Sequence, residues 1–346
     1  MIRLVLAIVF CFSVVSSYAQ PPAAECASWP DPSANPPIRS GEILVAAANS
    51  PPSYQAAACF SDIQEAIDFA QSHDSGWAVT PNVVLAPGNY WIDQTIRIGY
   101  GPNGEPHHNH GCNVAGSART WLRWSGAESQ WMVQYAVKEG QANTHRAPCN
   151  LVLDGRRLAH GMLLQRYHGR PVHDLTFRNC KRGLQATNSW ICDFRRLQAT
   201  NCTETAIDLG NWSVGSLVGV SIHKCRGNSP LLRIRAACSE VRIVNLESSD
   251  SGDSPAVVMD GCTSCTLEGV RTERCKATAI VRAANSKALS LSGMSLWEDP
   301  GTVGVLLKDS HHCEVSRIIG YNFPAGNLVQ QTGGCHHNEF VRIVED

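Results

Sequence analysis

The side chains best suited to chemistry lie between positions 200 and 235. Arg233 and Arg235 are two residues apart, so both point to the same side of an extended strand, and guanidinium groups bind carboxylates through a fork of N–H donors. A cation that neutralises a uronate carboxylate acidifies the neighbouring C–H bond, and a base can then remove that proton. The sequence therefore predicts β-elimination, with Arg233, Arg235, His223 and Asp208 as catalytic residues.

Simpler structural roles remain open for these residues. Asp208 and Arg233 can form a salt bridge between neighbouring coils of a repeat, with no part in catalysis. His223 can be half of a surface pair with Glu247. Hydrolysis would instead need two opposed carboxylates roughly 5–9.5 Å apart, and Glu204 with Asp208 makes an incomplete set.

The charge along the chain is uneven. From Arg146 to Arg242 there are 15 Lys/Arg and 6 Asp/Glu, a balance of +9, whereas the other residues after Ala19 include 13 basic and 24 acidic ones, a balance of −11. A basic zone attracts anionic polymers, although it can also be an ordinary solvated face. For an exported protein, we expect an acidic polysaccharide as partner and no nucleic acid. The predicted substrate-binding residues in this zone are Lys181, Arg182, Gln185 and Arg178.

Strand-like blocks repeat from position 175 to the end of the chain. They begin 22, 23, 24, 26, 24 and 24 residues apart, and each is followed by a second alternating block and a third short one. Three short strands per 22–26 residues are typical of a β-solenoid, in which inward side chains stack on their counterparts one coil away. The blocks begin at Leu175, Leu197, Val220, Val244, Val270, Met294 and Ile318.

The N-terminal part divides into three segments. Arg3, an apolar stretch and a small-residue cleavage site predict a signal peptide over residues 1–19, and no later apolar run is long enough to span a membrane. Residues 20–58, rich in Pro, Ala and Ser, predict a loosely packed extension. Residues 59–346 form the predicted β-helix domain, which starts with a helix near 61–71 with Ser61 as its N-cap. We therefore predict a secreted or otherwise extracytoplasmic protein in the periplasm, at the cell surface or outside the cell.

A helix, a strand, the Pro87-Gly88 turn and another strand, followed by such repeats, resemble the N-terminal cap of the pectate-lyase-like superfamily. The resemblance implies an all-β fold, the right-handed parallel β-helix. Arg233-Ile234-Arg235 is similar to the Arg-Ile-Lys strand with which polygalacturonases contact the substrate carboxylate. Glu204 and Asp208 have the spacing of a calcium-ligand pair in pectate lyases, which implies calcium as the metal ion bound by these two residues.

The chain departs from both families at the motif level. The Asn-Thr-Asp strand, the Asp-Asp pair and the Gly-His-Gly turn of polygalacturonases are missing from the matching coils, as are the further aspartates of pectate lyases. Lys181-Arg182-Gly183 occupies the place of an expected acidic coil. The resemblance therefore covers nearly all of residues 59–346 as a fold, but the family motifs only in fragments.

Cysteines recur at one turn position of the repeat. Fourteen cysteines follow the predicted signal peptide, and in an exported protein some of them are candidates for disulfide bonds. A column of small buried turn residues is the simpler interpretation. The column consists of Cys180, Cys202, Cys225 and Cys275, with Ser249 filling the gap.

Two histidine clusters could bind zinc. The first, His107-His108-Asn109-His110, lies in a Gly/Pro/Asn-rich stretch. In the second, His311-His312-Cys313 precedes Cys335-His336-His337 by one coil. Imidazole and thiolate groups close together can share a zinc ion. A surface loop for the first cluster and structural corner residues for the second are the simpler interpretations.

The sequence as a whole predicts a secreted carbohydrate-active β-helix that acts on an acidic polysaccharide. Lyase chemistry is favoured over a glycoside hydrolase of polygalacturonase type, and a non-catalytic surface or carbohydrate-binding β-helix is the rival, because one fold hosts all three. No helix pattern covers the C-terminal coil, whose strand edge could pair with another chain. We predict a monomer in preference to a weak end-to-end dimer.

Overall fold

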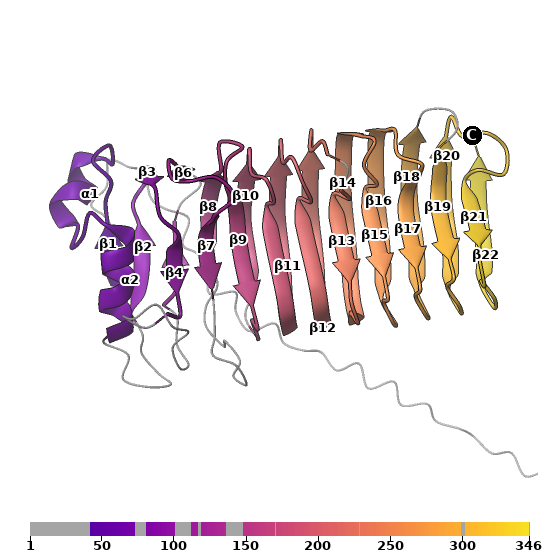
Figure 1. The fold of residues 1–346 in the computed structure, drawn as a ribbon, viewed down its shortest axis with the longest axis horizontal. Helices are drawn as coiled ribbons and strands as arrows, with labels where there is room; N and C mark the ends of the chain where they lie inside the picture. The colour runs from indigo at the N-terminus through magenta and orange to yellow at the C-terminus, as the bar shows by residue number, and fades with distance from the viewer. Residues whose placement is uncertain are drawn as a thin grey trace, which may run out of the picture.

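The computed structural model describes residues 42–72, 81–100, 112–116, 119–135, 148–169, 171–227, 229–298 and 302–345. These residues form parallel strands that coil into one elongated solenoid, with two short helices at its N-terminal end (Figure 1). The predicted right-handed parallel β-helix is confirmed. The predicted signal peptide, residues 20–41 of the predicted extension and the His107–His110 cluster lie outside the described residues.

Each coil contributes strands to three faces. The second face holds β4 (Ile96–Ile98), β7 (Trp131–Tyr135), β9 (His160–Gln165), the starts of β11 (Leu184–Thr200) and β12 (Ile207–His223), β13 (Leu232–Arg235), β15 (Val257–Asp260), β17 (Ala279–Ala284), β19 (Val303–Lys308) and β21 (Val329–Thr332). The third face begins with β1 (Glu42–Val45), β2 (Asn82–Leu85) and β5 (Val114–Ala115), and the first face with β3 (Gly88–Ile92) and β6 (Thr120–Trp124).

In the later coils the third and first faces share continuous strands. These are β8 (Cys149–Asp154), β10 (Val172–Arg178), the later parts of β11 and β12, β14 (Ser239–Gly252), β16 (Thr266–Cys275), β18 (Ser290–Glu298), β20 (Glu314–Tyr321) and β22 (Glu339–Glu345).

A single left-handed residue bends each of these strands between the two faces. In β14 the residue is Asn245, with a φ of 57°, so the third short strand of this coil passes directly into the first strand of the next coil. Such a conformation is unfavourable for most L-residues, yet it recurs once per coil along one column. The members of that column are Asn150, Asp174, Arg196, Gly219, Asn245, Gly269, Gly293, Arg317 and Arg342.

The register corrects one predicted alignment. Leu246, not Val244, lies beside Val220, and Val270 follows Leu246 on the next coil. The 26-residue spacing predicted between Val244 and Val270 therefore belongs one coil earlier, between Val220 and Leu246. Because the shift is two residues, the inward and outward faces of the strand keep their identities. The residues that lie side by side on neighbouring coils do change: Leu246 lies beside Val220, and Ser249 beside His223.

The N-terminal cap begins earlier than predicted. β1 and the helix α1 (Pro52–Ala57) lie inside the predicted extension, so the folded part starts by Glu42. The predicted cap helix is α2 (Ile63–Ser72), and its apolar face is buried as expected. Asp62, not Ser61, caps it, because Asp62 Oδ1 accepts the Glu65 backbone N–H at 2.8 Å. Asp62 directly precedes Ile63, the first residue of the helix, which is the usual place of an N-cap.

Two glutamines attach this helix to the edge of the second face. Gln64 Oε1 accepts the Arg97 backbone N–H at 2.8 Å, and Gln64 Nε2 donates to the Arg97 carbonyl at 3.0 Å. Gln71 binds the backbone just after this strand in a similar way: its Oε1 accepts the Gly99 N–H, and its Nε2 donates to the Tyr100 carbonyl. The two side-chain amides thus replace a neighbouring strand at β4 and satisfy its edge.

The cysteines are packing residues of the corners. Among the described cysteines the structure contains no disulfide bond, so the expectation of bridged cysteines is not met there. Cys180, Cys202, Cys225 and Cys275 are buried as predicted. Ser249 does not fill the gap in their column, because the two-residue shift places it beside His223.

A second corner column supplies hydrogen bonds between coils. At Cys238, Ser286, Ser310 and Cys335 the side chain accepts a backbone N–H of the coil before it. For example, Ser286 Oγ accepts from Cys262 at 3.1 Å, and Ser310 Oγ accepts from Ser286 at 3.2 Å. The column runs through Cys238, Cys262, Ser286, Ser310 and Cys335.

This column can be tested by paired substitutions. Ser286→Ala leaves the buried Cys262 N–H without an acceptor, so we expect the free energy of unfolding to fall by about 1–3 kcal/mol. Ser286→Cys should cost less, because cysteine accepts the equivalent backbone N–H at Cys238 and Cys335, two coils away on either side. Urea denaturation followed by circular dichroism measures both. Equal stability of the two variants would show that the bond contributes nothing.

Candidate functional site

An ion pair organises the middle of the second face. Arg235 Nε and Nη2 donate to Asp208 Oδ1 and Oδ2 at 2.9 and 3.2 Å. The Asp208 side chain is 5% exposed and that of Arg235 34%. Hydrogen bonding to this carboxylate raises the pKa of Arg235. The two-point geometry holds both groups in place.

The Arg235 side chain of this pair lies over Gly210. In the register of β12 and β13, Asp208 lies beside Arg233, and Gly210 lies beside Arg235. A Cβ at Gly210 would be 3.7 Å from Arg235 Cγ and Cζ, so the arginine side chain lies over a backbone that has no side chain of its own. The predicted salt bridge between Asp208 and Arg233 is therefore wrong. The partner is Arg235, which reaches diagonally back to Asp208.

Arg233 is left with a different role. It points outward between Asp208 and Val258 of the neighbouring coils and is half-buried. Within the described part of the chain no ion pair of Arg233 is found, since the nearest carboxylate in register, Asp208, is bound by Arg235. Its guanidinium can accept an anion without breaking an existing contact.

The predicted calcium pair is divided between two arginines. Glu204 Oε2 accepts from Arg182 Nε at 2.7 Å, and Arg182 Nη1 also donates to Gln185 Oε1 at 3.0 Å. Asp208 is bound separately by Arg235. Among the residues that the structure describes, no group of three or more His, Cys, Asp or Glu is arranged to hold a metal ion. Three of the predicted site residues, Arg182, Gln185 and Glu204, do come together.

Four residues beside this cluster escaped the sequence analysis. Lys181 Nζ donates to Ser129 Oγ at 2.7 Å and to the Glu128 carboxylate, and that bond lowers the pKa of Glu128. The His160 ring lies 4.7 Å from the Trp131 ring, and burial lowers the pKa of His160. No repeat signal marks these positions, because they lie before the regular blocks begin at Leu175. They come next to the cluster only because the preceding coils stack on it in the folded protein.

His223 and Arg178 lie on the first face. The His223 ring bonds to Ser249 Oγ at 2.7 Å through Nδ1 and to Ser221 Oγ through Nε2. The proposed surface pair with Glu247 is wrong, because Glu247 lies beside Ser221 in the register. His223 therefore does not face Arg233, and the predicted set of four catalytic residues is not assembled on one surface.

The C-terminal histidines stack in two pairs. The ring centroids of His311 and His336 are 3.9 Å apart, and those of His312 and His337 are 5.0 Å apart. Cys335 Sγ accepts the Ser310 N–H, and Cys313 is buried. The arrangement fits structural corner residues, which is the simpler of the two interpretations.

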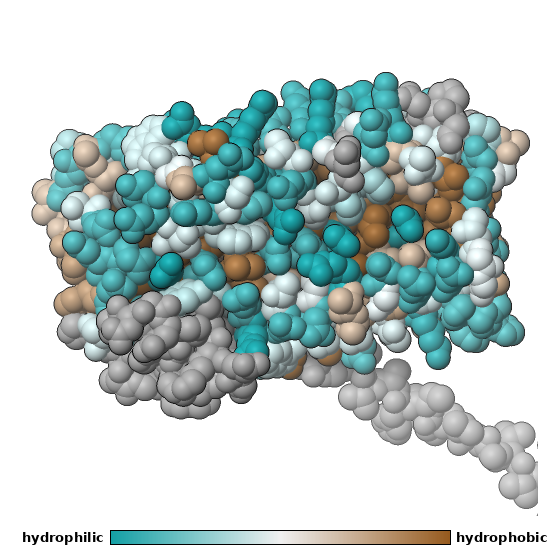
Figure 2. All heavy atoms as spheres, viewed as in Figure 1, coloured by the Kyte–Doolittle hydropathy of each residue, from teal (hydrophilic) through white to brown (hydrophobic). Residues whose placement is uncertain are grey.

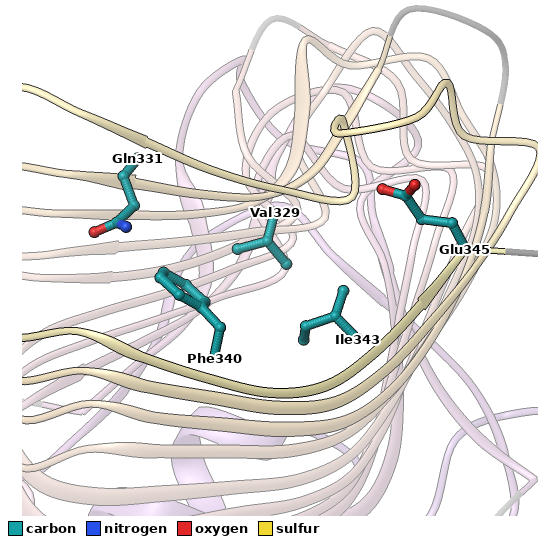
Figure 3. Close-up of a pocket in the computed structure, with 5 residues that line it drawn as sticks. All are labelled: Val329, Gln331, Phe340, Ile343 and Glu345. Carbon is teal, nitrogen blue, oxygen red and sulfur yellow. The ribbon is translucent and has the colours of Figure 1, made fainter.

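A hollow opens at the C-terminal coil (Figure 3). It has a volume of about 270 Å³, is open to solvent and is lined by Val329, Gln331, Phe340, Ile343 and Glu345. Val329 and Ile343 continue inward columns of the preceding coils. Glu345 binds the backbone N–H groups of Gly326 and Leu328 at 3.1 and 3.4 Å. The hollow is therefore the end of the hydrophobic interior, and the second face remains the better candidate site.

The arrangement on the second face suits anion binding better than acid–base chemistry. Asp208 and Glu204 each accept hydrogen bonds from an arginine, so neither carboxylate can contact a ligand without breaking an existing ion pair. Hydrolysis needs one carboxyl group that donates a proton. Figure 2 shows that hydrophilic residues predominate on one side of the solenoid, with hydrophobic patches between them.

A substitution separates the structural from the functional role of Asp208. Asp208→Asn removes the charge that pairs with Arg235, and we expect the free energy of unfolding to fall by about 1–3 kcal/mol. Asp260→Asn is the matched control, because Asp260 lies beside Arg235 in the register but its Oδ1 bonds to Asn285. Thermal and urea denaturation measure the difference. A stable Asp208→Asn protein that has lost its activity on, or binding to, a ligand would give Asp208 a direct functional role.

Comparisons with known proteins identify the fold. No family model and no curated protein matches the sequence. Among solved structures, Geobacillus virus E2 ORF18 is similar with a TM-score of 0.61 and 13% identity, over 82% of this chain and 57% of the viral one. The DFA-IIIase of Arthrobacter chlorophenolicus A6, in complex with GF2, has a TM-score of 0.55 and 10% identity, over 88% and 96% of the two chains.

An endo-xylogalacturonan hydrolase from Aspergillus tubingensis is similar with a TM-score of 0.53 and 8% identity, over 77% of this chain and 85% of the enzyme. The chain thus spans a little over half of the viral protein and most of the two enzymes. At these identities the likeness concerns the fold. It supports the predicted right-handed parallel β-helix fold.

Proposed function

We propose that this protein is exported and binds an acidic polysaccharide on its second face, where Arg233 binds a sugar carboxylate. The observation that carries the proposal is the difference between two neighbouring arginines. Arg235 is held by Asp208, whereas Arg233 points outward with no ion pair among the described residues. A guanidinium in this state offers a carboxylate its fork of donors.

The surroundings support an anionic ligand. Arg233 belongs to the stretch from Arg146 to Arg242, whose balance is +9, and a surface of this charge concentrates polyanions near it. The hydrolase from Aspergillus tubingensis is named for a galacturonan, which makes an acidic glycan a reasonable first ligand to test. No described helix is long and apolar enough to cross a bilayer.

Lyase chemistry is the second candidate, and His160 favours it. Burial lowers the pKa of His160, so the imidazole is neutral at neutral pH, as a base must be. Its Nδ1, however, lies 3.3 Å from the Arg182 backbone nitrogen and accepts that N–H. The proton of the neutral ring is then on Nε2, and removal of a substrate proton would need this bond to break. Binding without turnover is therefore the better supported function.

The binding proposal predicts a specific loss at Arg233. Arg233→Ala should weaken binding of polygalacturonate by about tenfold or more, which corresponds to roughly 1.4 kcal/mol or more. Arg242→Ala is the matched control, because it removes the same charge from an exposed arginine that pairs with Glu268. Affinity electrophoresis in gels with and without polygalacturonate compares the two. An equal loss of polygalacturonate binding in both variants would show that net charge, and not a site at Arg233, explains the effect.

Binding should also weaken steeply as the salt concentration rises, because screening shortens the reach of the surface charges. Dextran, a neutral polymer, serves as the control ligand. Equal affinity at low and high ionic strength, or equal binding of the neutral polymer, would contradict the acidic-ligand proposal.

The two candidate functions differ in their products. The purified protein, incubated with polygalacturonate and alginate, should give neither the ultraviolet absorbance of unsaturated uronates nor new reducing ends. Unsaturated product that disappears in His160→Gln but persists in His223→Gln would establish the lyase and identify His160 as its base. Reducing ends without that absorbance would indicate hydrolysis and contradict both proposals.

A further inference from the structure

Tryptophan and arginine side chains interleave on the first face, near its N-terminal end. Arg123 Cζ lies 5.7 Å from the ring centroid of Trp91 and 5.1 Å from that of Trp121. Arg156 Cζ is 5.5 Å from the Trp91 ring, and Arg178 Cζ is 5.2 Å from the Trp121 ring. Guanidinium groups at these distances interact with the negative faces of the rings. We call these five residues the Trp–Arg platform.

The β-helix register builds the platform. Trp91 of β3 lies beside Arg123 of β6, and Arg123 and Arg178 lie on either side of Asp154 of β8. Trp121 is two residues before Arg123, so both point to the same outer surface of β6. Residues separated by more than eighty positions therefore meet on one surface.

The positive charge of the platform is incompletely neutralised. Within the described residues, Arg123, Arg156 and Arg178 form no ion pair, and the buried Nε of Arg123 has no hydrogen-bond partner. The carboxylate between them, Asp154, accepts from Asn179 Nδ2 and from the Arg156 backbone N–H, at 3.0 and 3.2 Å. Three guanidinium groups thus face one carboxylate.

The exposure of the platform indicates a ligand-binding surface. Trp91 is 58% exposed, and tryptophan and arginine are enriched at interaction surfaces. Guanidinium groups that stack on indole rings keep their N–H donors in the guanidinium plane, where they can still bind an anion. Since arginines already lie against both rings, the surface suits a carboxylate-bearing sugar better than a stacked nucleic-acid base.

We propose that the Trp–Arg platform is a second binding site for acidic sugars, separate from the Arg233 site. Arg156 and Arg178 bind the sugar carboxylate, and the exposed part of Trp91 packs against the apolar side of the ring. Arg123, which lies between the two tryptophans, holds them apart and orients them. The site takes the same class of ligand as the proposed function but depends on different residues, so each can fail without the other.

The same outer column offers a matched control. It continues through Arg178, Thr200, His223, Ser249 and Glu273 to Trp297 and Tyr321. Trp297 is 44% exposed and stacks on Tyr321 at 4.1 Å, but its neighbour Glu273 is acidic and pairs with Arg271. Trp297 thus has the aromatic surface of the platform without its unpaired cations.

The test is titration calorimetry with tetragalacturonate. The wild-type protein should bind two molecules per chain, and Trp91→Ala or the double variant Arg156→Gln/Arg178→Gln should bind one. The Arg233→Ala variant should also bind one molecule. The double variant Arg233→Ala/Trp91→Ala should bind none, and the control Trp297→Ala should bind two. Circular dichroism confirms that each variant is folded, and these residues are exposed or half-buried. Maltotetraose, a neutral sugar, should not bind.

The possible results separate the two sites. Two molecules bound to Trp91→Ala and to the double arginine variant would overturn the platform. Two molecules bound to Arg233→Ala, with one bound to Trp91→Ala, would overturn the Arg233 site and leave the platform intact. A parallel titration with oligothymidylate tests whether the platform binds nucleic acid instead. Binding of this oligomer, lost in Trp91→Ala while tetragalacturonate binding is unchanged, would make the platform a nucleic-acid site and overturn the proposal.

Discussion

The in-register stacking of parallel coils is the constraint on which the rest of this structure depends. Each strand bonds to the equivalent strand of the next coil, so a bend must occur at the same place in every coil. Left-handed residues such as Asn245 make the bend between the third and first faces. The conformation costs a non-glycine residue on the order of 1 kcal/mol, and the backbone hydrogen bonds on both sides of each bend offset that cost.

Stacking turns positions in the repeat into columns, and the columns determine which side chains meet. Inward columns hold the apolar core. Corner columns of serine and cysteine supply acceptors for backbone N–H groups that would otherwise be buried without partners. Outward columns bring together charges from distant parts of the chain, as in the pair of Asp208 and Arg235. The chemistry of the surface is therefore a consequence of the register.

Several carboxylates on these faces already have partners, and this limits what the surface can do. Glu204 and Asp208 are bound by arginines, so they contact a ligand only if those ion pairs break. Arginines without an ion pair among the described residues can bind a ligand directly, and they include Arg233 on one face and the arginines around Trp91 and Trp121 on another. An elongated protein with separate cationic surfaces is well suited to hold a long anionic polymer.

The sequence by itself determined the fold, because alternating apolar residues at a period of 22–26 positions have few other ways to be buried. It also determined that Asp208, Arg233 and Arg235 point outward, and that the N-terminal helix buries one face. It could not determine the partners. Moving the β14 register by two residues leaves the same side chains facing inward, so the sequence pattern is compatible with either register. The backbone bend at Asn245 decides between them and places Ser249 beside His223.

The choice of Arg235 over Arg233 as the partner of Asp208 was likewise a matter of tertiary structure. Both arginines have the same charge and point to the same side, and Arg233 is the nearer one in the register. Arg235 reaches diagonally back over the Gly210 backbone and donates to both oxygens of Asp208. The Trp–Arg platform depends in the same way on coils that meet only after folding. Patterns in a sequence record which face a side chain takes, whereas its contacts depend on the shape of the neighbouring coil.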